Sequence, residues 1–383
     1  MHFFEPLCKY YCVRCNARVG GPLKLDREPR RCSRCILPET WPGLRLDAGG
    51  VCQQCRQFEK RWGRWLRDPT VRAQAFRTFE RAVERGRKLR RGRYDALVPV
   101  SGGKDSLEVL RIAREELHLE CLAYTYDNGL MTPSALDNIR RVTGALKVPH
   151  LLDRRPEQRE LLRHFLLKTG LPCGACFIPL LFGVHQTIRR EGIRLILWGL
   201  SRRTEAAMPI GKDPWNFRSV VEDGMGLSAI RGIWGEHPIL DYLLDRVRGR
   251  LELVCVPDFY EWDEDEIRER LARRFGATFE GPHSDCLGAG TMEWVWYQRY
   301  GFGAPTARLS QAIRMNRIGR DEALELVSRL EPPGLPPSLQ QVAEAAGVTV
   351  DKILAGAQRD QGRYHRSLLH RAAEFYRNWY LGR

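Results

Sequence analysis

The chain lacks a long apolar run. No window of its 383 residues approaches the roughly 20 consecutive apolar residues that a membrane-spanning helix needs, so we expect no membrane span. The first residues, MHFFEPLCKYYC, also lack the basic start and extended apolar stretch of a secretory signal peptide. These absences argue against an integral membrane protein and a secreted one, and we expect a cytoplasmic protein.

Acidic residues are scarce relative to basic ones. The sequence has 62 Lys and Arg against 47 Asp and Glu, which gives a formal net charge of +15. Such a surface can attract nucleic acid, nucleotide sugars or anionic lipid. The arginines are scattered rather than gathered in one tail, so solvated helix faces explain the charge equally well. No internal repeat or low-complexity tract is present, and the apolar fraction of 43% is enough to fill a core.

Short apolar runs alternate with helical patterns from residue 94 onward, as expected for an α/β protein with a parallel sheet covered on both faces. Because ligands bind such sheets at the carboxyl ends of the strands, the functional residues should follow the strands. The pattern predicts strands at 94–100, 120–126, 149–152, 194–198 and 251–256, and helices at 104–117, 133–146, 156–168, 177–191 and 263–275.

Composition divides the chain into three expected parts. Residues 1–60 are rich in Cys, Pro and Gly and cannot build much of a core, so a metal would have to organise them. Residues 61–290 hold the alternating pattern, led in by a basic amphipathic helix at 71–92. Residues 291–383 form a helical C-terminal region.

A Gly-rich loop, SGGKDS, follows the first predicted strand and opens a helix. Its glycines let backbone N–H groups approach an anion closely, and the helix adds its positive end. A Walker A loop needs GxxxxGK[ST], which is absent here. The loop instead resembles the pyrophosphatase loop (PP-loop) of the adenine nucleotide α-hydrolase superfamily, whose enzymes cleave ATP to AMP and pyrophosphate in a Rossmann-like domain. The resemblance implies that ATP is held by Ser101, Gly102, Gly103, Lys104, Asp105 and Ser106, with Lys104 and Asp105 acting in catalysis.

Two later strand ends complete the expected ATP site. In that superfamily the end of the second strand contacts the adenosine, and Asp127 stands there in this chain. Gly199 ends the fourth strand, and the nearby Glu205 is the carboxylate expected to bind Mg²⁺ and to act in catalysis. Magnesium prefers one or two carboxylates together with phosphate oxygens. Either Asp127 or Glu205 could instead serve only to cap a turn.

The N-terminal cysteines have the spacing of a zinc ribbon. Cys32-x-x-Cys35 and Cys52-x-x-Cys55 are separated by 16 residues rich in Pro and Gly. Four thiolates at this spacing suit a tetrahedral structural Zn²⁺. Three more cysteines lie upstream and form either a second zinc site, with His2 as fourth ligand, or spare thiols: Cys8, Cys12 and Cys15.

A further thiol group joins distant parts of the chain. Cys173 and Cys176 form a CxxC pair, and Cys286 stands alone in HSDCLG; we expect all three in loops near the active edge of the sheet. Three thiolates could hold a [4Fe–4S] cluster with one open position, or zinc with His283. A redox pair, a thiol of low pKa at the start of the next helix and inert buried cysteines are the alternatives.

Several segments together resemble the N-acetyl sugar amidotransferases, PP-loop enzymes of surface-polysaccharide sugars. They are RCSRCILPETWPGLRLDAGGVCQQC, VPVSGGKDS, LPCGACF, LILWG and HSDCLGAGT, within a resemblance that covers residues 30–365. It implies that ATP adenylates the acetamido oxygen of a nucleotide sugar, and that ammonia from a separate glutaminase subunit displaces AMP to give an acetamidino group. The chain departs from that family at Ala307, Ala312 and residues 200–202, near the expected acceptor pocket.

Two other functions fit the same motifs. Some tRNA thiolation enzymes resemble this layout, with a zinc ribbon, the same ATP loop and three cysteines on a [4Fe–4S] cluster. The reaction would then insert sulfur into tRNA, whose backbone the basic charge would contact, or into a small molecule. A non-catalytic, nucleic-acid-binding zinc protein with a degenerate ATP fold is the third interpretation, which the intact SGGKDS loop disfavours.

Overall fold

The computed structural model describes residues 28–41, 44–201, 203, 245, 247–281 and 285–358. Six residues of the expected sites lie outside them: His2, Cys8, Cys12, Cys15, Glu205 and His283. In the part that is described, no helix combines the length and the apolar character that a membrane crossing requires.

Five parallel strands form the central sheet, in the order β3-β2-β1-β4-β5, which confirms the predicted α/β fold. Leu97 of β1 pairs with Leu122 of β2 on one side and with Ile196 of β4 on the other. The strands are short and mostly buried, as the apolar runs predict. Their bounds are Ala96–Pro99 (β1), Cys121–Tyr126 (β2), His150–Asp153 (β3), Leu195–Trp198 (β4) and Glu252–Cys255 (β5).

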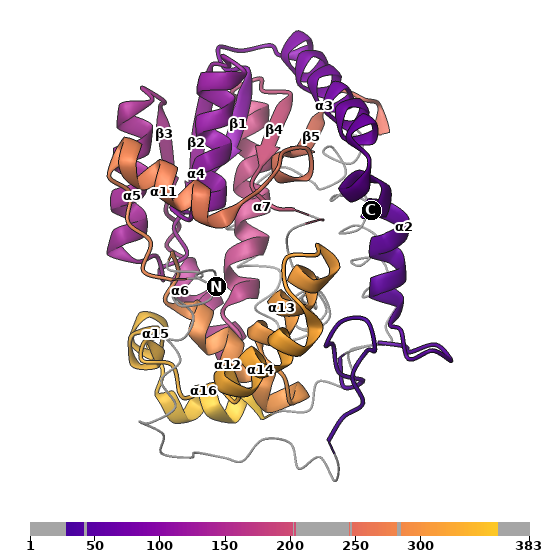
Figure 1. The fold of residues 1–383 in the computed structure, drawn as a ribbon. Helices are drawn as coiled ribbons and strands as arrows, with labels where there is room; N and C mark the ends of the chain where they lie inside the picture. The colour runs from indigo at the N-terminus through magenta and orange to yellow at the C-terminus, as the bar shows by residue number, and fades with distance from the viewer. Residues whose placement is uncertain are drawn as a thin grey trace.

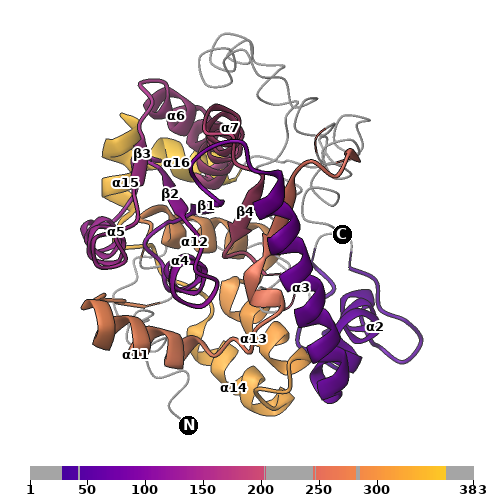
Figure 2. The same ribbon diagram turned by 90° about the horizontal axis from the view of Figure 1, so that it is seen from above.

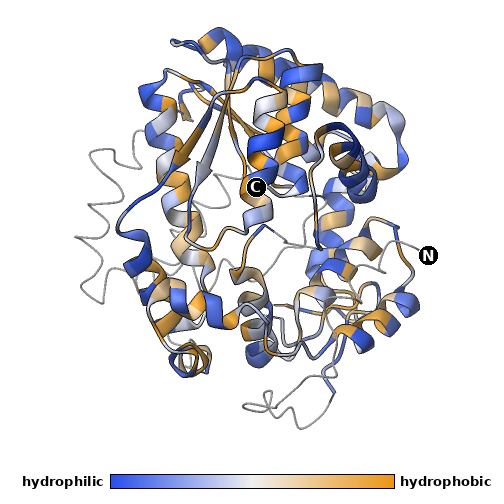
Figure 3. Cartoon of the chain, turned by 90° about the vertical axis from the view of Figure 1, so that its left-hand side faces the viewer, coloured by the Kyte–Doolittle hydropathy of each residue, from blue (hydrophilic) through white to orange (hydrophobic). Residues whose placement is uncertain are grey.

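Helices cover both faces of the sheet, as Figures 1 and 2 show. Alternate strand residues point to opposite faces, so Val98 packs against one group of helices and Leu97 against another. Val98 shares its core with α3 (Pro69–Leu89), α4 (Lys104–Arg111), α5 (Pro133–Ala145) and α11 (Glu264–Phe275). Leu97 shares its core with α7 (Cys173–Arg190). The helices carry apolar and polar residues on different sides (Figure 3).

The remaining helices form a second layer beyond the carboxyl ends of the strands (Figure 1). Leu130, which follows β2, packs into the apolar core that joins α6, α12, α15 and α16. Helices α13 and α14 build a smaller core beside them around Leu309 and Val327. The bounds are Gln158–Thr169 (α6), Gly288–Tyr300 (α12), Ala304–Arg314 (α13), Arg320–Leu330 (α14), Leu339–Ala346 (α15) and Val350–Ala357 (α16).

The N-terminal cysteine segment, described at residues 28–41 and 44–55, packs on this helical layer rather than on the sheet. Trp41 stacks on Phe302, with ring centroids 4.8 Å apart, and the segment's core includes Ala307 of α13. Helix α2 (Gln53–Arg67) leads from the segment to α3. It begins beside the last two cysteines and buries Phe58 and Trp65. Composition predicts no helix before residue 71, and the buried aromatic rings hold this one in place.

Candidate ATP-binding site and cysteine groups

The SGGKDS loop lies at the point where the strand order reverses. From β1 the chain proceeds to β2 and β3 on one side of the sheet, and later to β4 and β5 on the other. A crevice forms at such a switch point, beyond the carboxyl ends of the strands. Gly199, which follows β4, lies directly against the loop, since a Cβ added there would come 3.1 Å from the Cα of Ser106. The structure therefore brings together the loop and Gly199, as predicted.

The loop is shaped by its own serines. The Ser101 backbone N–H donates to Ser106 Oγ at 3.1 Å, and Ser106 Oγ donates to the Gly103 carbonyl at 3.1 Å. Gly103 is the N-cap residue of α4, and no side chain caps this end. Because the first N–H groups of a helix have no partner within it, they are available to an anion. A phosphate group fits this arrangement.

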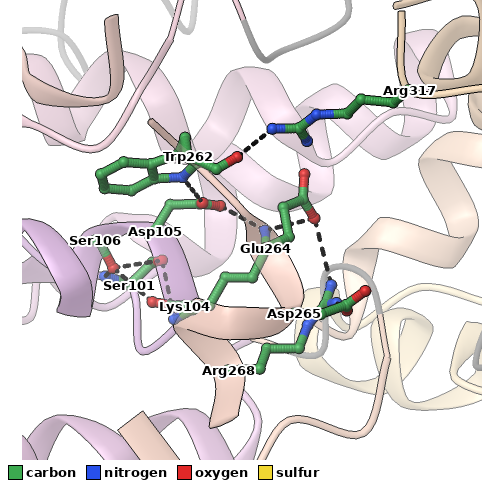
Figure 4. Close-up of polar contacts among 10 residues, drawn as sticks. Ser101, Lys104, Asp105, Ser106, Trp262, Glu264, Asp265, Arg268 and Arg317 are labelled. Carbon is green, nitrogen blue, oxygen red and sulfur yellow. Dashed lines mark hydrogen bonds and ion pairs between the residues drawn. The ribbon is translucent and has the colours of Figure 1, made fainter. Parts of the chain in front are cut away.

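Lys104 is held at the loop by two carboxylates (Figure 4). Its Nζ lies 2.7 Å from Asp105 Oδ2 and 3.1 Å from Glu264 Oε2 at the start of α11. Burial alone would lower the pKa of Lys104, but the charges of Asp105 and Glu264 outweigh it and raise that pKa. Burial alone would raise the pKa of Glu264. The charges of Lys104 and Arg268 lower that pKa by more, so the net shift is downward. Both groups are therefore charged at neutral pH.

Trp262 and Glu264 belong to the site, although the sequence analysis missed both. The Trp262 indole Nε1 donates to Asp105 Oδ1 at 2.7 Å, and the Trp262 carbonyl accepts a hydrogen bond from Arg317. A signal was available: the two residues follow the last strand, β5, so they stand at the carboxyl edge where ligands bind. The acidic residues at 263–266 also suit the N-terminus of the predicted helix 263–275, which explains them without a site.

Replacing Trp262 with Phe should lower ATP-dependent AMP formation about tenfold while leaving the fold intact. Phe keeps most of the buried ring but cannot donate to Asp105, and a hydrogen bond to a charged group contributes roughly 1.5–3 kcal/mol. Trp65→Phe is the matched control, because its buried Nε1 has no hydrogen-bond partner among the residues that the structure describes. Steady-state kinetics and thermal unfolding measure both. Equal losses in the two variants would attribute the effect to packing.

Two more carboxylates lie beyond the carboxyl ends of the strands, and one of them borders the loop. Asp127 follows β2, where its carboxylate accepts from the Gly129 N–H at 3.0 Å and from Arg154 Nε at 2.8 Å. This is the geometry of a turn residue, and a contact with adenosine stays a prediction. Asp285 was not expected; a Cβ added to Gly103 would lie 3.1 Å from Asp285 Oδ2. Asp285, the residue before Cys286, therefore lies against the SGGKDS loop.

Cys173, Cys176 and Cys286 converge next to Asp285. Cys176 Sγ and Cys286 Sγ each accept a hydrogen bond from Asn128 Nδ2, at 3.3 and 3.8 Å. The expectation that the CxxC pair lies in a loop is wrong, because Cys173 begins helix α7 and Cys176 lies in its first turn. The alternative of a thiol with a low pKa is also wrong. Burial raises the pKa of Cys176 to about 11 and that of Cys286 to about 12.

The four cysteines of the predicted zinc ribbon form a compact, fully buried cluster, which we call the ribbon quartet: Cys32, Cys35, Cys52 and Cys55. Cys32 Sγ lies 3.9 Å from Cys55 Sγ, and Cys35 Sγ lies 3.9 Å from Cys52 Sγ. Zn–S bonds of about 2.3 Å in a tetrahedron place the sulfurs roughly 3.8 Å apart. The spacing therefore fits one metal ion, with zinc the ion that the ligand set favours.

The ribbon quartet is the only set of three or more Cys, His, Asp or Glu residues, within the described chain, whose ligand atoms all lie within 4.8 Å. In the second cysteine group, at least two of the three sulfurs are therefore more than 4.8 Å apart, which is wider than the spacing of thiolates around a single tetrahedral ion. The group consists of Cys173, Cys176 and Cys286. They are soft donors, as is Met292 Sδ, which lies 3.1 Å from Cys173 Sγ. A larger, thiophilic group suits such ligands.

Arg314 of α13 supports the ribbon quartet. Its Nε donates to Cys55 Sγ at 3.4 Å and its Nη2 to Cys35 Sγ at 3.5 Å, while the residue is almost fully buried. A divalent metal with four thiolates carries net negative charge, which a buried guanidinium offsets. Arg320 of α14 donates to the carbonyls of Cys32 and Cys35. The quartet is thus joined to the C-terminal helices by charge as well as by packing.

Comparison with known proteins yields three results. A family model described as "LPS biosynthesis protein WbpG-like, C-terminal domain" matches residues 269–377. The uncharacterized protein MJ1599 of Methanocaldococcus jannaschii is 22% identical over 259 residues, which are 68% of this chain and 80% of that protein. The U34-tRNA thiolase NcsA from Methanococcus maripaludis, solved with its [4Fe–4S] cluster, aligns with 80% of this chain and 90% of its own at 13% identity and a TM-score of 0.34. A likeness that low adds nothing to the topology described above.

Proposed function

We propose that this protein uses ATP to adenylate an oxygen atom of its acceptor, with release of pyrophosphate. The observation that carries the proposal is the loop itself, a Gly-rich turn at the switch point of a parallel sheet. It leads into a helix whose N-terminus has no side-chain cap, and the mostly buried Lys104 lies beside it. These features favour binding of a polyphosphate.

The chemistry needs no protein nucleophile. The acceptor oxygen attacks the α-phosphorus, the bond to the bridging oxygen breaks, and pyrophosphate leaves. The chain's part is to orient the phosphates and to stabilise their negative charge through the loop N–H groups and the Lys104 ammonium. Mg²⁺ would neutralise further charge on the phosphates. The described carboxylates that border the loop, and could hold it, are Asp105, Glu264 and Asp285, and Glu205 remains an expected ligand.

For the acceptor we propose an acetamido group on a nucleotide sugar, with ammonia displacing AMP to leave an acetamidino group. Support comes from the match of residues 269–377 to a C-terminal domain described for lipopolysaccharide biosynthesis. The matched residues include helices α12 to α16, which lie beyond the carboxyl edge of the sheet (Figure 1), where an acceptor would meet the adenylated site. A glutaminase subunit would supply the ammonia.

Sulfur insertion is the second candidate, and one observation favours it. Asp285 borders the ATP loop, and its neighbour Cys286 shares the Asn128 amide with Cys176. A group of three thiols beside an adenylation site could carry sulfur taken from an external persulfide donor, or hold a [4Fe–4S] cluster that binds sulfide, for transfer to tRNA or to a small molecule with AMP as the leaving group. Product analysis decides between the two. Incubation with ATP plus ammonium should change the mass of an acetamido sugar only in the first case.

Replacing Lys104 with Ala should lower the rate of pyrophosphate release at least 100-fold. Removing one group that stabilises charge in the transition state typically costs a factor of roughly 100 to 1,000. AMP and pyrophosphate formation measure the loss, whichever acceptor is used. Lys352→Ala removes an exposed lysine of α16 and should be neutral. Wild-type rates in Lys104→Ala would refute ATP activation at this loop.

A loss of folding must be separated from a loss of chemistry in that experiment. Lys104→Ala takes the nearer of two cations from the half-buried Glu264 and leaves Arg268, at 3.4 Å. That loss is destabilising in itself. The double variant Lys104→Ala/Glu264→Gln removes both charges and should recover much of the thermal stability. Activity should remain at the low level of the single variant. Recovery of activity together with stability would show that Lys104 is only structural.

A further inference from the structure

Asn128 lies between strand β2, which pairs with the strand before the SGGKDS loop, and the cysteines Cys176 and Cys286. Hydrogen bonds fix its side chain there. It follows β2 and is buried, with 7% of its surface exposed. Its Oδ1 accepts a hydrogen bond from the Leu130 N–H at 2.8 Å, and its Nδ2 donates to Cys176 Sγ and Cys286 Sγ. One side chain thus joins two cysteines that are 110 residues apart in the chain.

The orientation of this carboxamide follows from its partners. The Leu130 N–H can only donate, so it selects the amide oxygen and turns the NH₂ group toward the sulfurs. The Asn128 carbonyl accepts from Gln158 Nε2 at 2.9 Å, and Gln158 Oε1 accepts from the Tyr126 hydroxyl at 2.7 Å. Backbone and side chain of Asn128 are therefore both fixed by buried groups.

Two N–H bonds directed at sulfur are strongest where the sulfurs are metal-bound thiolates. A neutral thiol is a weak acceptor, whereas a thiolate bound to metal accepts strongly, and such outer contacts orient metal ligands and tune the metal. The Asn128 amide makes such contacts with both Cys176 Sγ and Cys286 Sγ.

We propose that Asn128 is a positioning residue that holds Cys176 and Cys286 as anionic ligands of an iron–sulfur group, with Cys173 as the third ligand. The inference rests on the sulfur-insertion candidate above and not on ATP use. The donor set fits such a group: three soft sulfurs lie too far apart for one tetrahedral ion, and amide donors face two of them. Hydrogen bonds to ligand sulfurs also raise the reduction potential of a cluster.

Anaerobic reconstitution with ferrous iron and sulfide tests the proposal on the full chain. Wild type should retain more iron than Cys286→Ser, whose residual iron measures binding at the ribbon quartet. Asn128→Asp should lose its iron to a chelator at least tenfold faster than wild type, because outer-shell changes cost roughly 10- to 100-fold in metal affinity. Any cluster that it retains should have a lower reduction potential.

The Asp variant separates positioning from folding. Asp keeps the shape and the oxygen that accepts from Leu130, and a merely structural turn residue would keep its iron after this change. Because a buried carboxylate is costly in itself, iron loss is compared at a temperature well below the thermal transition of both proteins. Asn316→Asp adds the same charge at an exposed position and should keep its iron. Iron retention in Asn128→Asp equal to wild type would overturn the proposal, as would equal iron in wild type and Cys286→Ser. Lys104→Ala should leave the iron content unchanged. Iron retention and AMP formation therefore test the two proposals separately.

Discussion

Replacing Cys52 with Ser should release the metal ion that we expect in the ribbon quartet and unfold the N-terminal segment. Cys52 is fully buried, and its sulfur also accepts from the Cys55 N–H at the start of α2. The substitution therefore removes a metal ligand, while the Ser hydroxyl can still cap the helix, so the loss is assigned to the metal. Structural zinc contributes about 10–16 kcal/mol in isolated zinc-finger peptides, far more than a segment with so small a core gains by packing alone.

The effect should extend beyond the segment itself. Arg314, which donates to Cys35 and Cys55, also donates to Gln311, and Gln311 donates to the Arg203 carbonyl. The Arg203 N–H in turn donates to Asp258, just after β5. Loss of the metal leaves the Arg314 charge buried against neutral thiols, which is costly. We therefore expect slower AMP formation as well as a lower thermal transition.

Metal analysis, limited proteolysis and thermal unfolding measure these consequences. Cys121→Ser is the matched control, since it removes a buried sulfur from β2 that belongs to neither cysteine group. It should cost only the roughly 1–3 kcal/mol of a buried polar substitution and leave the metal content unchanged. An unaltered metal content in Cys52→Ser would exclude the quartet as the metal site.

The parts of the molecule that the sequence could predict are those with local signals. The sheet follows from apolar runs such as 94–100 and 194–198, because a strand buried on both faces needs no partner to be recognised. The SGGKDS loop follows from its place between a predicted strand and a predicted helix and from its resemblance to the PP-loop, and the CxxC pairs follow from their spacing. Their geometry in the structure agrees with these predictions: Gly199 lies against Ser106, and the four sulfurs of the ribbon quartet meet.

Other features depend on contacts between distant segments, which spacing cannot reveal. Trp262 reaches Asp105 across 157 residues, and Asn128 reaches Cys286 across 158. The loop predicted at the CxxC pair 173–176 is wrong for a related reason. Its Gly174 indicates a loop, yet a Cβ there would come within 2.7 Å of the Phe165 ring, so the glycine permits α6 and α7 to approach. Close packing, and not a turn, requires it.

Gly102→Ala should abolish ATP binding and destabilise the protein by roughly 2–6 kcal/mol, combining backbone strain of about 1–3 kcal/mol with overpacking of similar size. Gly102 has a φ of +83°, and an added Cβ would lie 2.7 Å from the Ala135 Cα and closer still to its carbonyl oxygen. Both obstacles are main-chain atoms at the start of α5, so no side-chain rotation relieves them. The loop must move, and the N–H groups that would face phosphate move with it.

The two contributions can be separated within this chain. Gly249 also has a positive φ, of +63°, but nothing lies within 4 Å of a Cβ added there. Gly249→Ala should therefore cost only the strain, about 1 kcal/mol for a left-handed residue in open space, and keep ATP binding. Denaturant unfolding and nucleotide titration measure both variants. Suppose instead that Gly102→Ala lowers stability and ATP binding no more than Gly249→Ala does. The main chain of α5 would then move aside easily, and the loop would not be the rigid phosphate site on which ATP activation depends.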